Sequence, residues 1–511
     1  MPRPPPNYDY LREEIEVLLQ VSGLTHNAVR AWMKEQKGVD ISHATFERVI
    51  AAWGITTRPR RADLSAYDEE RLRARIEELF WESDEDDATC YEILTIDGFA
   101  LSKWQFVELR KSMGLYRRIP KDDQPSYDEI IKSVLVGVIK GGALEDYGYR
   151  NLAREMRNEF KLIGRNRIFK IAYRMNSAPF DARRIGKRVK VRSYLPKAKG
   201  PNHIWSVDAY CKLELFGIQI YCCINVYSRK IIWAYVGTMA KTKFSVFSQY
   251  LSAVDQLGFT PQILRADHSV ETPMMADAHL CFRENQEGHQ LRFNKAFWYT
   301  TSKGNNTIER FWGLGASAAF NRWRDLFIEL RNNRLYDEDQ RADRVAFLAV
   351  YVPIMRYTVW LFVGSHNRHR IRKHPEITGY VAGIPNTLYA YPELKGTENY
   401  GIYIDTAHPE IRQMVQNKDE FDLISYLPPA TMHWVDHTLV EGGFPTELDG
   451  REQAANGEKL HVVAYLHLRA AAAAHLAAGG ELVEFQRPAQ GAGLQPRDRT
   501  REVFAANSFP L

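Results

Sequence analysis

The sequence predicts an α/β core in the middle of the chain, preceded by small all-α modules and followed by a helical and partly disordered C-terminal extension. Three observations predict this fold class. Residues 200–266 alternate runs rich in Ile, Val, Tyr and Trp with one amphipathic helix. Residues 10–175 carry apolar residues at helical spacing. Residues 486–501 are rich in Pro, Gly, Gln and Arg, a composition that resists packing.

Length and composition indicate a multidomain protein inside the cell. A chain of 511 residues that is 45% hydrophobic can bury several cores. The net charge of +5 is small for this length, so any nucleic-acid-binding surface must be a local one. The five cysteines show no paired metal-ligand spacing, which argues against a disulfide framework and a zinc finger. Residues 1–20 lack the continuous apolar stretch of a secretory signal, so we expect the protein not to be secreted.

Residues 1–57 predict a first helix-turn-helix module. Their apolar residues recur at helical spacing in three groups: Leu11, Ile15, Leu18 and Leu19; Val29, Trp32 and Met33; Phe46, Val49 and Ile50. Gly23 and Thr25 separate the first two groups, and Ser42 can cap the third helix. Three short helices joined by tight turns outline this kind of module.

Residues 64–120 repeat the pattern and predict a second module. A helix from Tyr67 to Trp81 precedes an acidic turn, a helix near Tyr91, and a helix that Ser102 can cap. Units of three helices are common both as DNA-binding domains and as protein-interaction domains. Both interpretations stay open for each of these two modules.

Residues 125–180 predict a third module. Tyr147–Leu152 opens one helix and Arg165–Lys170 begins another that runs to Met175. This segment resembles the helix-turn-helix that precedes the catalytic core in many bacterial insertion-sequence transposases. We therefore expect Arg165, Arg167 and Lys170 to contact DNA.

A basic linker follows at residues 181–199. Eight basic residues and no acidic one lie between Arg183 and Lys199, and Gly186 and Pro196 interrupt any helix. Such a run attracts a polyanion by releasing counterions. The expected phosphate contacts in this linker are Arg183, Arg184, Lys187, Arg188, Lys190 and Arg192. A bare spacer and a nuclear-import signal are the alternatives.

Residues 200–330 form the predicted α/β core. Strands are expected at His203–Leu215, Ile218–Tyr227 and Lys230–Gly237, separated by short turns. A helix follows at Lys243–Leu257, and the strand Gln262–Ala266 leads directly into Asp267. Three strands, a helix and a further strand are the order of the ribonuclease H-like fold.

Four ordered motifs in this core resemble those of the DDE-type integrases and transposases, including the retroviral integrases and the integrase-core proteins of eukaryotic DNA transposons. The motifs are Ile204–Asp208, Tyr227–Arg229, Leu264–Asp267 and Thr307–Trp312. The resemblance continues at Asn321–Leu330, at Val345–Val363 and at Asn367–Arg372. It implies that Asp208, Asp267 and Glu309 are the catalytic, metal-binding residues.

The sequence departs from the family pattern at three places. Ser269 stands where the family usually has glycine, and Asn225 stands where a carboxylate is frequent. The 41 residues between Asp267 and Glu309 exceed the commonest spacing, which indicates an insertion near Glu284–Gly288.

The chemistry explains the need for three acids. In-line displacement at a phosphodiester is served by two Mg²⁺ ions about 4 Å apart, and Mg²⁺ prefers oxygen ligands. The resemblance implies two Mg²⁺ ions, with Mn²⁺ as a substitute, and Asp208 as the ligand that bridges them. His268 and Glu271 lie beside Asp267 but stay outside the predicted set.

The C-terminal part is expected to comprise a helical extension at residues 331–425 and a further region at 426–511. Val345–Val363 is apolar for about the length of a membrane span, but Pro353 and Arg356 interrupt it, so we expect a buried helix and no membrane contact. Leu460–Leu468 is expected to be a strand and Arg469–Ala478 a helix. The last part of this region is expected to be disordered.

The resemblance implies a transposase or integrase that cleaves double-stranded DNA at element termini and joins them to a target. Such enzymes generally act as homo-oligomers assembled on DNA. The expected location is the nucleus in a eukaryote, or the cytoplasm and nucleoid in a bacterium. Two alternatives stay open: a domesticated regulator that binds DNA without cutting it, and a ribonuclease H-like nuclease acting on RNA–DNA hybrids. Three helix-turn-helix units favour duplex DNA.

Overall fold

The computed structural model describes residues 8–21, 26–55, 66–83, 85–117, 124–140, 156, 165–175, 177, 198–300, 305–315, 319–372, 381–454, 457–485 and 495–506. The chain forms two compact units. The first comprises Met1–Glu78 with Cys90–Met113, and the second comprises Leu79–Thr89 with Gly114–Leu511. Each unit is described by itself.

The N-terminal region is helical, as the spacing of its apolar residues predicts. Its elements are the 3₁₀ turn η1 (Asp9–Leu11), α1 (Arg12–Glu16), the π-helical turn η2 (Val17–Val21), α2 (His26–Lys37) and α3 (His43–Ala52). The Ser42 side chain accepts a hydrogen bond from the backbone N–H of Thr45 at 3.2 Å, as expected of a helix cap. Nine buried apolar side chains form its core: Leu11, Ile15, Leu19, Val29, Met33, Ile41, Phe46, Ile50 and Ile55.

Three further helices confirm the second predicted set: α4 (Ala66–Glu82), α5 (Asp87–Ile96) and α6 (Lys103–Ser112). Ser102 and Gln105 form a capping box at the start of α6. In the second unit, α7 (Gln124–Lys140) and α10 (Arg165–Met175) are joined by Arg167, whose Nε lies 2.6 Å from Asp128 Oδ1. The helix predicted to open at Tyr147 lies outside the described residues.

A mixed sheet of five strands is the centre of the second unit. The strands are β1 (Ile204–Tyr210), β2 (Gln219–Asn225), β3 (Ile231–Gly237), β5 (Ile263–Asp267) and β6 (Phe297–Thr300), in the order β3-β2-β1-β5-β6. β1 pairs antiparallel with β2 and parallel with β5. This topology agrees with the predicted ribonuclease H-like core, while β6 was not predicted.

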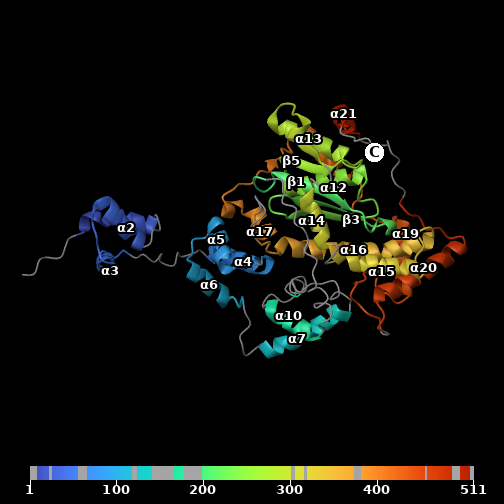
Figure 1. Cartoon of the computed structure of the whole chain (residues 1–511), viewed down its shortest axis with the longest axis horizontal. Coiled ribbons are helices and arrows are strands. Elements are labelled where there is room, and N and C mark those ends of the chain that lie inside the picture. The colour runs from blue at the N-terminus through green and yellow to red at the C-terminus, as the bar shows by residue number, and fades with distance from the viewer. Residues whose placement is uncertain are drawn as a thin grey trace, which may run out of the picture. The chain divides into compact units, whose positions relative to one another are not determined.

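Helices cover both faces of this sheet. Successive residues of a strand point to opposite sides, so each strand contributes side chains to both cores. On β2, Ile220, Cys222 and Ile224 join one core cluster. That cluster also contains residues of α14 (Asn306–Gly315), α15 (Asn321–Asn332), α16 (Arg341–Arg368), α19 (Pro429–Glu441) and α20 (Leu460–Ala477). Tyr221 and Cys223 join the other cluster, with α12 (Lys243–Leu257), α13 (Pro273–Glu287) and α18 (Pro409–Gln416). Figure 1 shows α16 on one side of the green strands.

The shorter elements complete the second unit. They are η3 (Glu214–Phe216), β4 (Phe259–Thr260), η4 (Phe293–Lys295), α17 (Pro385–Ala390), η7 (Pro392–Lys395), β7 (Ile402–Tyr403), η8 (Asn417–Glu420) and α21 (Asp498–Ala506). β4 and β7 form a separate antiparallel pair. The chain leaves α13 at Gly288, whose φ of +69° is the left-handed conformation that glycine adopts at helix ends. The lengthened interval before Glu309 therefore contains a full helix and the extra strand β6.

The helix α16 confirms the expectation of a buried helix over Val345–Val363. Among the described residues, α16 is the helix whose length and composition would allow it to cross a membrane. In this fold, 72% of its most apolar window is buried. A core helix passes the same test, so the finding is weak support for a membrane span.

Two C-terminal expectations are wrong. Leu460–Leu468 is part of the helix α20 and not a strand. Its Ala464, Leu468 and Ala472 are buried at a spacing of four residues, so packing against α16 outweighs the strand propensity of neighbouring valines. The expectation of a disordered end is wrong for α21, because this helix lies in the segment that was expected to stay unfolded.

Ion pairs with a distant helix explain why the composition of this segment wrongly indicated disorder at α21. Arg497 Nε lies 2.8 Å from Asp277 Oδ1, and Arg499 Nη1 lies 2.7 Å from Glu284 Oε1. Both acids belong to α13, more than 200 positions earlier in the chain. A contact of that range leaves no periodic trace in the local sequence.

Candidate active site

The first two predicted acids lie on neighbouring strands, Asp208 within β1 and Asp267 at the end of β5. β1 and β5 are parallel, and Ser206 lies opposite Arg265 in their register. Arg265 Nε donates a hydrogen bond to Ser206 Oγ at 2.8 Å, between two buried side chains. Asp208 and Asp267 each follow two positions later, so the strand repeat brings them to corresponding places.

Strand alternation also decides which face these two acids occupy. Val207 and Ala266 belong to the cluster under α12 and α13. Their neighbours Asp208 and Asp267 therefore point to the opposite face, the side that α14 covers. Both carboxyl residues are only partly exposed.

The helix α14 brings the third acid to this face. Asn305, just before the helix, donates from Nδ2 to the carbonyl oxygen of Val207 at 3.0 Å. Trp312 Nε1 donates to Asp208 Oδ2 at 3.0 Å. Glu309 precedes Trp312 by three residues and so lies one turn earlier on the same side of α14. Two hydrogen bonds to β1 thus hold the helix that carries Glu309, whose side chain is exposed.

The electrostatics show that the three carboxylates affect one another. Burial, together with the negative charges of Asp267 and Glu309, raises the pKa of Asp208 to about 7. The hydrogen bonds from the Ala209 backbone and from Trp312 act in the opposite direction. Like charges held together in a partly buried site are unfavourable unless a cation lies among them.

The donor chemistry of this group fits hard divalent cations, which take carboxylate oxygens as ligands. Within the described residues, a group with all its ligand atoms within 4.8 Å is found elsewhere, at His26, His43 and Glu47. The three carboxylates are spaced more widely than that. A pair of ions about 3.5–4 Å apart calls for ligands spread over such a span.

A fourth acid, Glu271, lies close to Asp267, although sequence reasoning set it aside. It is buried, and burial raises the pKa of its carboxyl group, with a further upward contribution from Asp267. Lys241 acts in the opposite direction. Its position in the loop directly after a site strand was the available signal. His268 packs its ring against Tyr299, with centroids 5.0 Å apart.

Asn225 has a structural role in the turn between β2 and β3. Its Oδ1 accepts hydrogen bonds from the backbone N–H and from the hydroxyl of Ser228, both at 3.0 Å. Its Nδ2 donates to Asn202 Oδ1 at 3.2 Å. The amide oxygen therefore closes the Tyr227–Arg229 turn, and the amide nitrogen adds a bond to Asn202 that a carboxylate could not donate.

Asn367, in the last of the family-like motifs, holds the edge strand β3. Its Oδ1 accepts from the backbone N–H of Ile231 at 2.8 Å, and its Nδ2 donates to the carbonyl of the same residue at 3.1 Å. The neighbouring His366 Nε2 lies 2.9 Å from the carbonyl oxygen of Arg229. This motif therefore fastens the end of α16 to the sheet.

We expect Asn367→Ala to lower the free energy of unfolding of the core by about 2–4 kcal/mol, because two buried backbone groups lose their partner. Asn332→Ala, at an exposed position of α15, should change it by less than about 0.5 kcal/mol. Chemical denaturation monitored by hydrogen exchange in β3 checks this. Equal stability of the two variants would contradict the fastening role.

The predicted DNA contacts are only partly described by the structure. Arg183, Arg184, Lys187, Arg188, Lys190 and Arg192 lie outside the described residues, as does the side chain of Arg165. Lys170 is exposed on α10. Arg167 is held by Asp128, and this hydrogen bond lowers the pKa of the Asp128 carboxyl group. The contact of Arg167 with Asp128 therefore contributes to the packing of α10 on α7.

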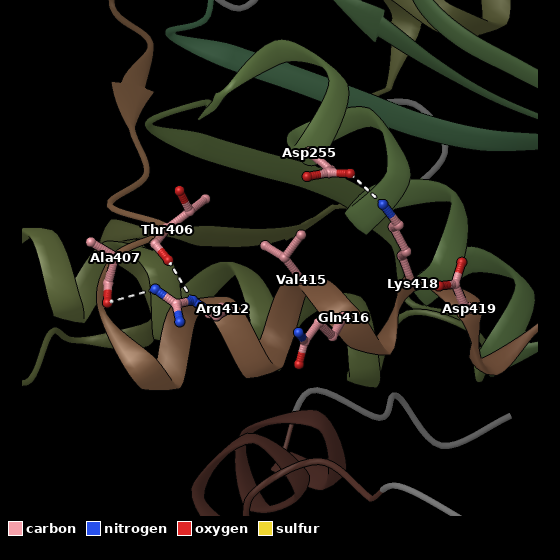
Figure 2. A pocket seen from close by; sticks show the side chains of 8 residues that line it. All are labelled: Asp255, Thr406, Ala407, Arg412, Val415, Gln416, Lys418 and Asp419. Carbon is pink, nitrogen blue, oxygen red and sulfur yellow. Dashed lines mark hydrogen bonds and ion pairs between the residues drawn. The ribbon is translucent and has the colours of Figure 1, made fainter.

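A separate surface pocket lies beside α18 (Figure 2). It is lined by Asp255, Thr406, Ala407, Arg412, Val415, Gln416, Lys418 and Asp419. Lys418 forms an ion pair with Asp255, and Arg412 Nε donates to the backbone oxygen of Thr406 at 3.2 Å. Its principal charged groups are engaged with one another or with the backbone, and none of the three predicted acids lines it.

Comparison with known proteins agrees with this fold. Residues 195–390 match the family model described as integrase core domain, so this part of the chain is an integrase-like core. A solved structure is also similar, described as a simian T-cell lymphotropic virus intasome in complex with PP2A regulatory subunit B56 gamma. Identity is 13%, coverage is 48% of this chain and 73% of that chain, and the TM-score is 0.24. No curated protein is significantly similar in sequence to this chain.

Proposed function

We propose that this protein is a DDE-type DNA transposase or integrase that cleaves phosphodiester bonds and joins the freed 3′ ends to target DNA. The observation that supports the proposal is that the charges of Asp267 and Glu309 both act on Asp208, within an integrase-like core. Two of these acids lie on parallel neighbouring strands, and the third lies on a helix that is bonded to one of those strands. Their charges raise the pKa of Asp208, which is expected of ligands gathered for a cation.

The proposed cofactor is a pair of Mg²⁺ ions, with Mn²⁺ as a substitute, held by these three carboxylates. When bound, the ions would supply activation of the attacking oxygen and stabilisation of the leaving oxygen. The charges of both other acids act on Asp208, so it is the proposed shared ligand. Trp312 orients the Asp208 carboxylate through the 3.0 Å hydrogen bond.

The residues around the acids keep them in place for this chemistry. Asn305 ties the first turn of α14 to β1, which limits the movement of Glu309 relative to Asp208. The Arg265–Ser206 hydrogen bond keeps β1 and β5 in register just before their acids. A displacement of about 1 Å at a reacting group can cost a hundredfold in rate, so this support matters for catalysis.

The proposed partner is double-stranded DNA, both at the element termini and at the target. The helical modules and the basic residues 183–199 would supply contacts to phosphates. We further propose that the protein assembles as a homo-oligomer on DNA, and that it acts in the nucleus of a eukaryote or in the nucleoid of a bacterium.

The direct test is incubation of the full chain with a labelled duplex of the element's own terminus, target DNA and Mg²⁺. Nicked termini and joined products that depend on the metal are expected. Tight binding of the terminus without cleavage, by protein assembled on paired ends, would favour the domesticated regulator instead. Cleavage of RNA–DNA hybrids in preference to duplex DNA would favour the nuclease.

The basic linker gives a separate prediction about affinity. Replacing Arg183, Arg184, Lys187 and Arg188 with alanine should weaken DNA binding for all sequences alike. The slope of log K against log salt should become shallower by about 0.9 for each phosphate that the protein no longer neutralises. Binding assays over a range of salt concentrations measure this slope. An unchanged slope would leave the linker as a spacer or an import signal.

A further inference from the structure

Two histidines and a glutamate of the N-terminal module point toward one another. His26 begins α2, while His43 and Glu47 lie one turn apart at the start of α3. One ligand atom from each lies within 4.8 Å of the other two, a spacing that could hold a metal ion. The group is far in sequence from the acids of the candidate active site, and it differs from them in chemistry.

The separations are those of ligands around a cation rather than of a direct bond. His26 Nδ1 lies 3.6 Å from Glu47 Oε1, and His43 Nδ1 lies 3.8 Å from the same oxygen. Hydrogen bonds between nitrogen and oxygen span about 2.7–3.2 Å, so both separations are too long. Two ligand atoms of a tetrahedral zinc ion, each about 2.0–2.2 Å from the metal, lie roughly 3.3–3.5 Å apart.

The surroundings fix one ligand and leave the others open to solvent. The His26 ring packs edge-on against Phe46, with centroids 5.7 Å apart, and Phe46 is fully buried in the module core. His43 and Glu47 are exposed, so an ion could enter from water without unfolding the module. An exposed histidine–glutamate pair by itself contributes little to stability.

We propose that His26, His43 and Glu47 bind a zinc ion that joins the first turns of α2 and α3, with water completing the coordination. Two imidazole nitrogens and one carboxylate oxygen suit Zn²⁺, whereas Mg²⁺ prefers ligands that are all oxygen. The chain then has two metal sites that different ions occupy.

The ion stabilises a module with a small core. Nine buried apolar side chains hold α1, α2 and α3 together, and domains of this size bury a modest fraction of their surface. An ion that binds only the folded form adds its binding free energy to the stability of that form. Zinc therefore fixes the angle at which α3 leaves its turn.

The test is a zinc titration of the full chain in excess Mg²⁺, followed by hydrogen exchange of peptides from residues 26–52. Zinc should slow exchange in α2 and α3 and saturate at one ion for this site. His43→Ala and Glu47→Gln should each weaken the zinc affinity by at least about tenfold, since even the partners of metal ligands cost about 10–100-fold when removed. Cobalt absorption in the visible range gives a second readout of the same site.

His437→Ala is the matched control. His437 Nδ1 lies 3.3 Å from Glu441 Oε2, an exposed pair at the same helical spacing, yet within the described residues this pair does not belong to a three-ligand metal group. This variant should keep the zinc response of the wild type. Absence of a zinc effect on α2 and α3 in the wild type, or an undiminished effect in both His43→Ala and Glu47→Gln, overturns the proposal. Exchange measured without zinc establishes that each variant is folded.

Discussion

Asp208→Asn is expected to abolish DNA cleavage and strand joining while leaving the fold and terminus binding intact. The substitution removes one negative charge and keeps nearly the same volume, and an asparagine can still accept the hydrogen bond from Trp312. The proposed metal pair would lose its shared ligand. Loss of several kcal/mol of transition-state stabilisation corresponds to a rate lower by about 1,000-fold or more.

The assay compares the wild type with two further variants on the same labelled terminus. Glu309→Gln should lose activity as well, because it removes another of the three charges. Glu329→Gln is the matched control, since this exposed glutamate lies on the neighbouring helix α15. It should cleave like the wild type. Equal cleavage by Asp208→Asn and the wild type would exclude the proposed site.

The same substitution is expected to stabilise the metal-free protein at pH 8. Burial and the neighbouring acids raise the folded-state pKa of Asp208 to about 7, from an ordinary value of 3.8. Between these values the folded state binds more protons than the unfolded state, so the free energy of unfolding falls as pH rises. The difference corresponds to at most ~4 kcal/mol of destabilisation above pH 7, which asparagine relieves.

Calorimetry in the presence of a chelator, at pH 8 and again at pH 4.5, measures this effect on the core transition. The variant should unfold at a higher temperature than the wild type at pH 8, and the gap should narrow at pH 4.5. Adding Mg²⁺ should raise the transition of the wild type more than that of the variant. A variant that is less stable at pH 8 would mean that the three carboxylates do not repel one another in solution.

Predicting the fold from sequence succeeded where the signal is local. Runs rich in Ile, Val, Tyr, Trp and Cys identified β1 and β2, although β1 ends at Tyr210 and not at the predicted Leu215. Ser42 and Ser102 marked two helix starts that the structure confirms. Prediction from the sequence failed where a contact with a distant segment determines the local structure. The helix α20 was taken in part for a strand, because its valines favour strands and its packing against α16 cannot be read from its own residues.

The candidate site also contains residues that the local sequence could identify and residues that it could not. Asp208 could be singled out because it lies among the apolar residues of a strand, Asp267 because it closes one, and Glu309 because of the motif around it. Glu271 was set aside, because its position after a site strand does not show that it is buried close to Asp267. Asn225 looked like a missing carboxylate until its bonds to Ser228 showed a turn.

The sequence by itself determined the order of strands and helix in the core, because strand-forming runs and helical apolar spacing each lie within one segment. Only the tertiary structure brings Asp267 and Glu309 near enough to Asp208 for their charges to act on it. Intervals of 58 and 41 residues separate the three acids in sequence. The parallel pairing of β1 with β5 and the bonds from Asn305 and Trp312 to β1 bring these distant segments together. Such contacts arise from packing between distant segments, so no local repeat encodes them.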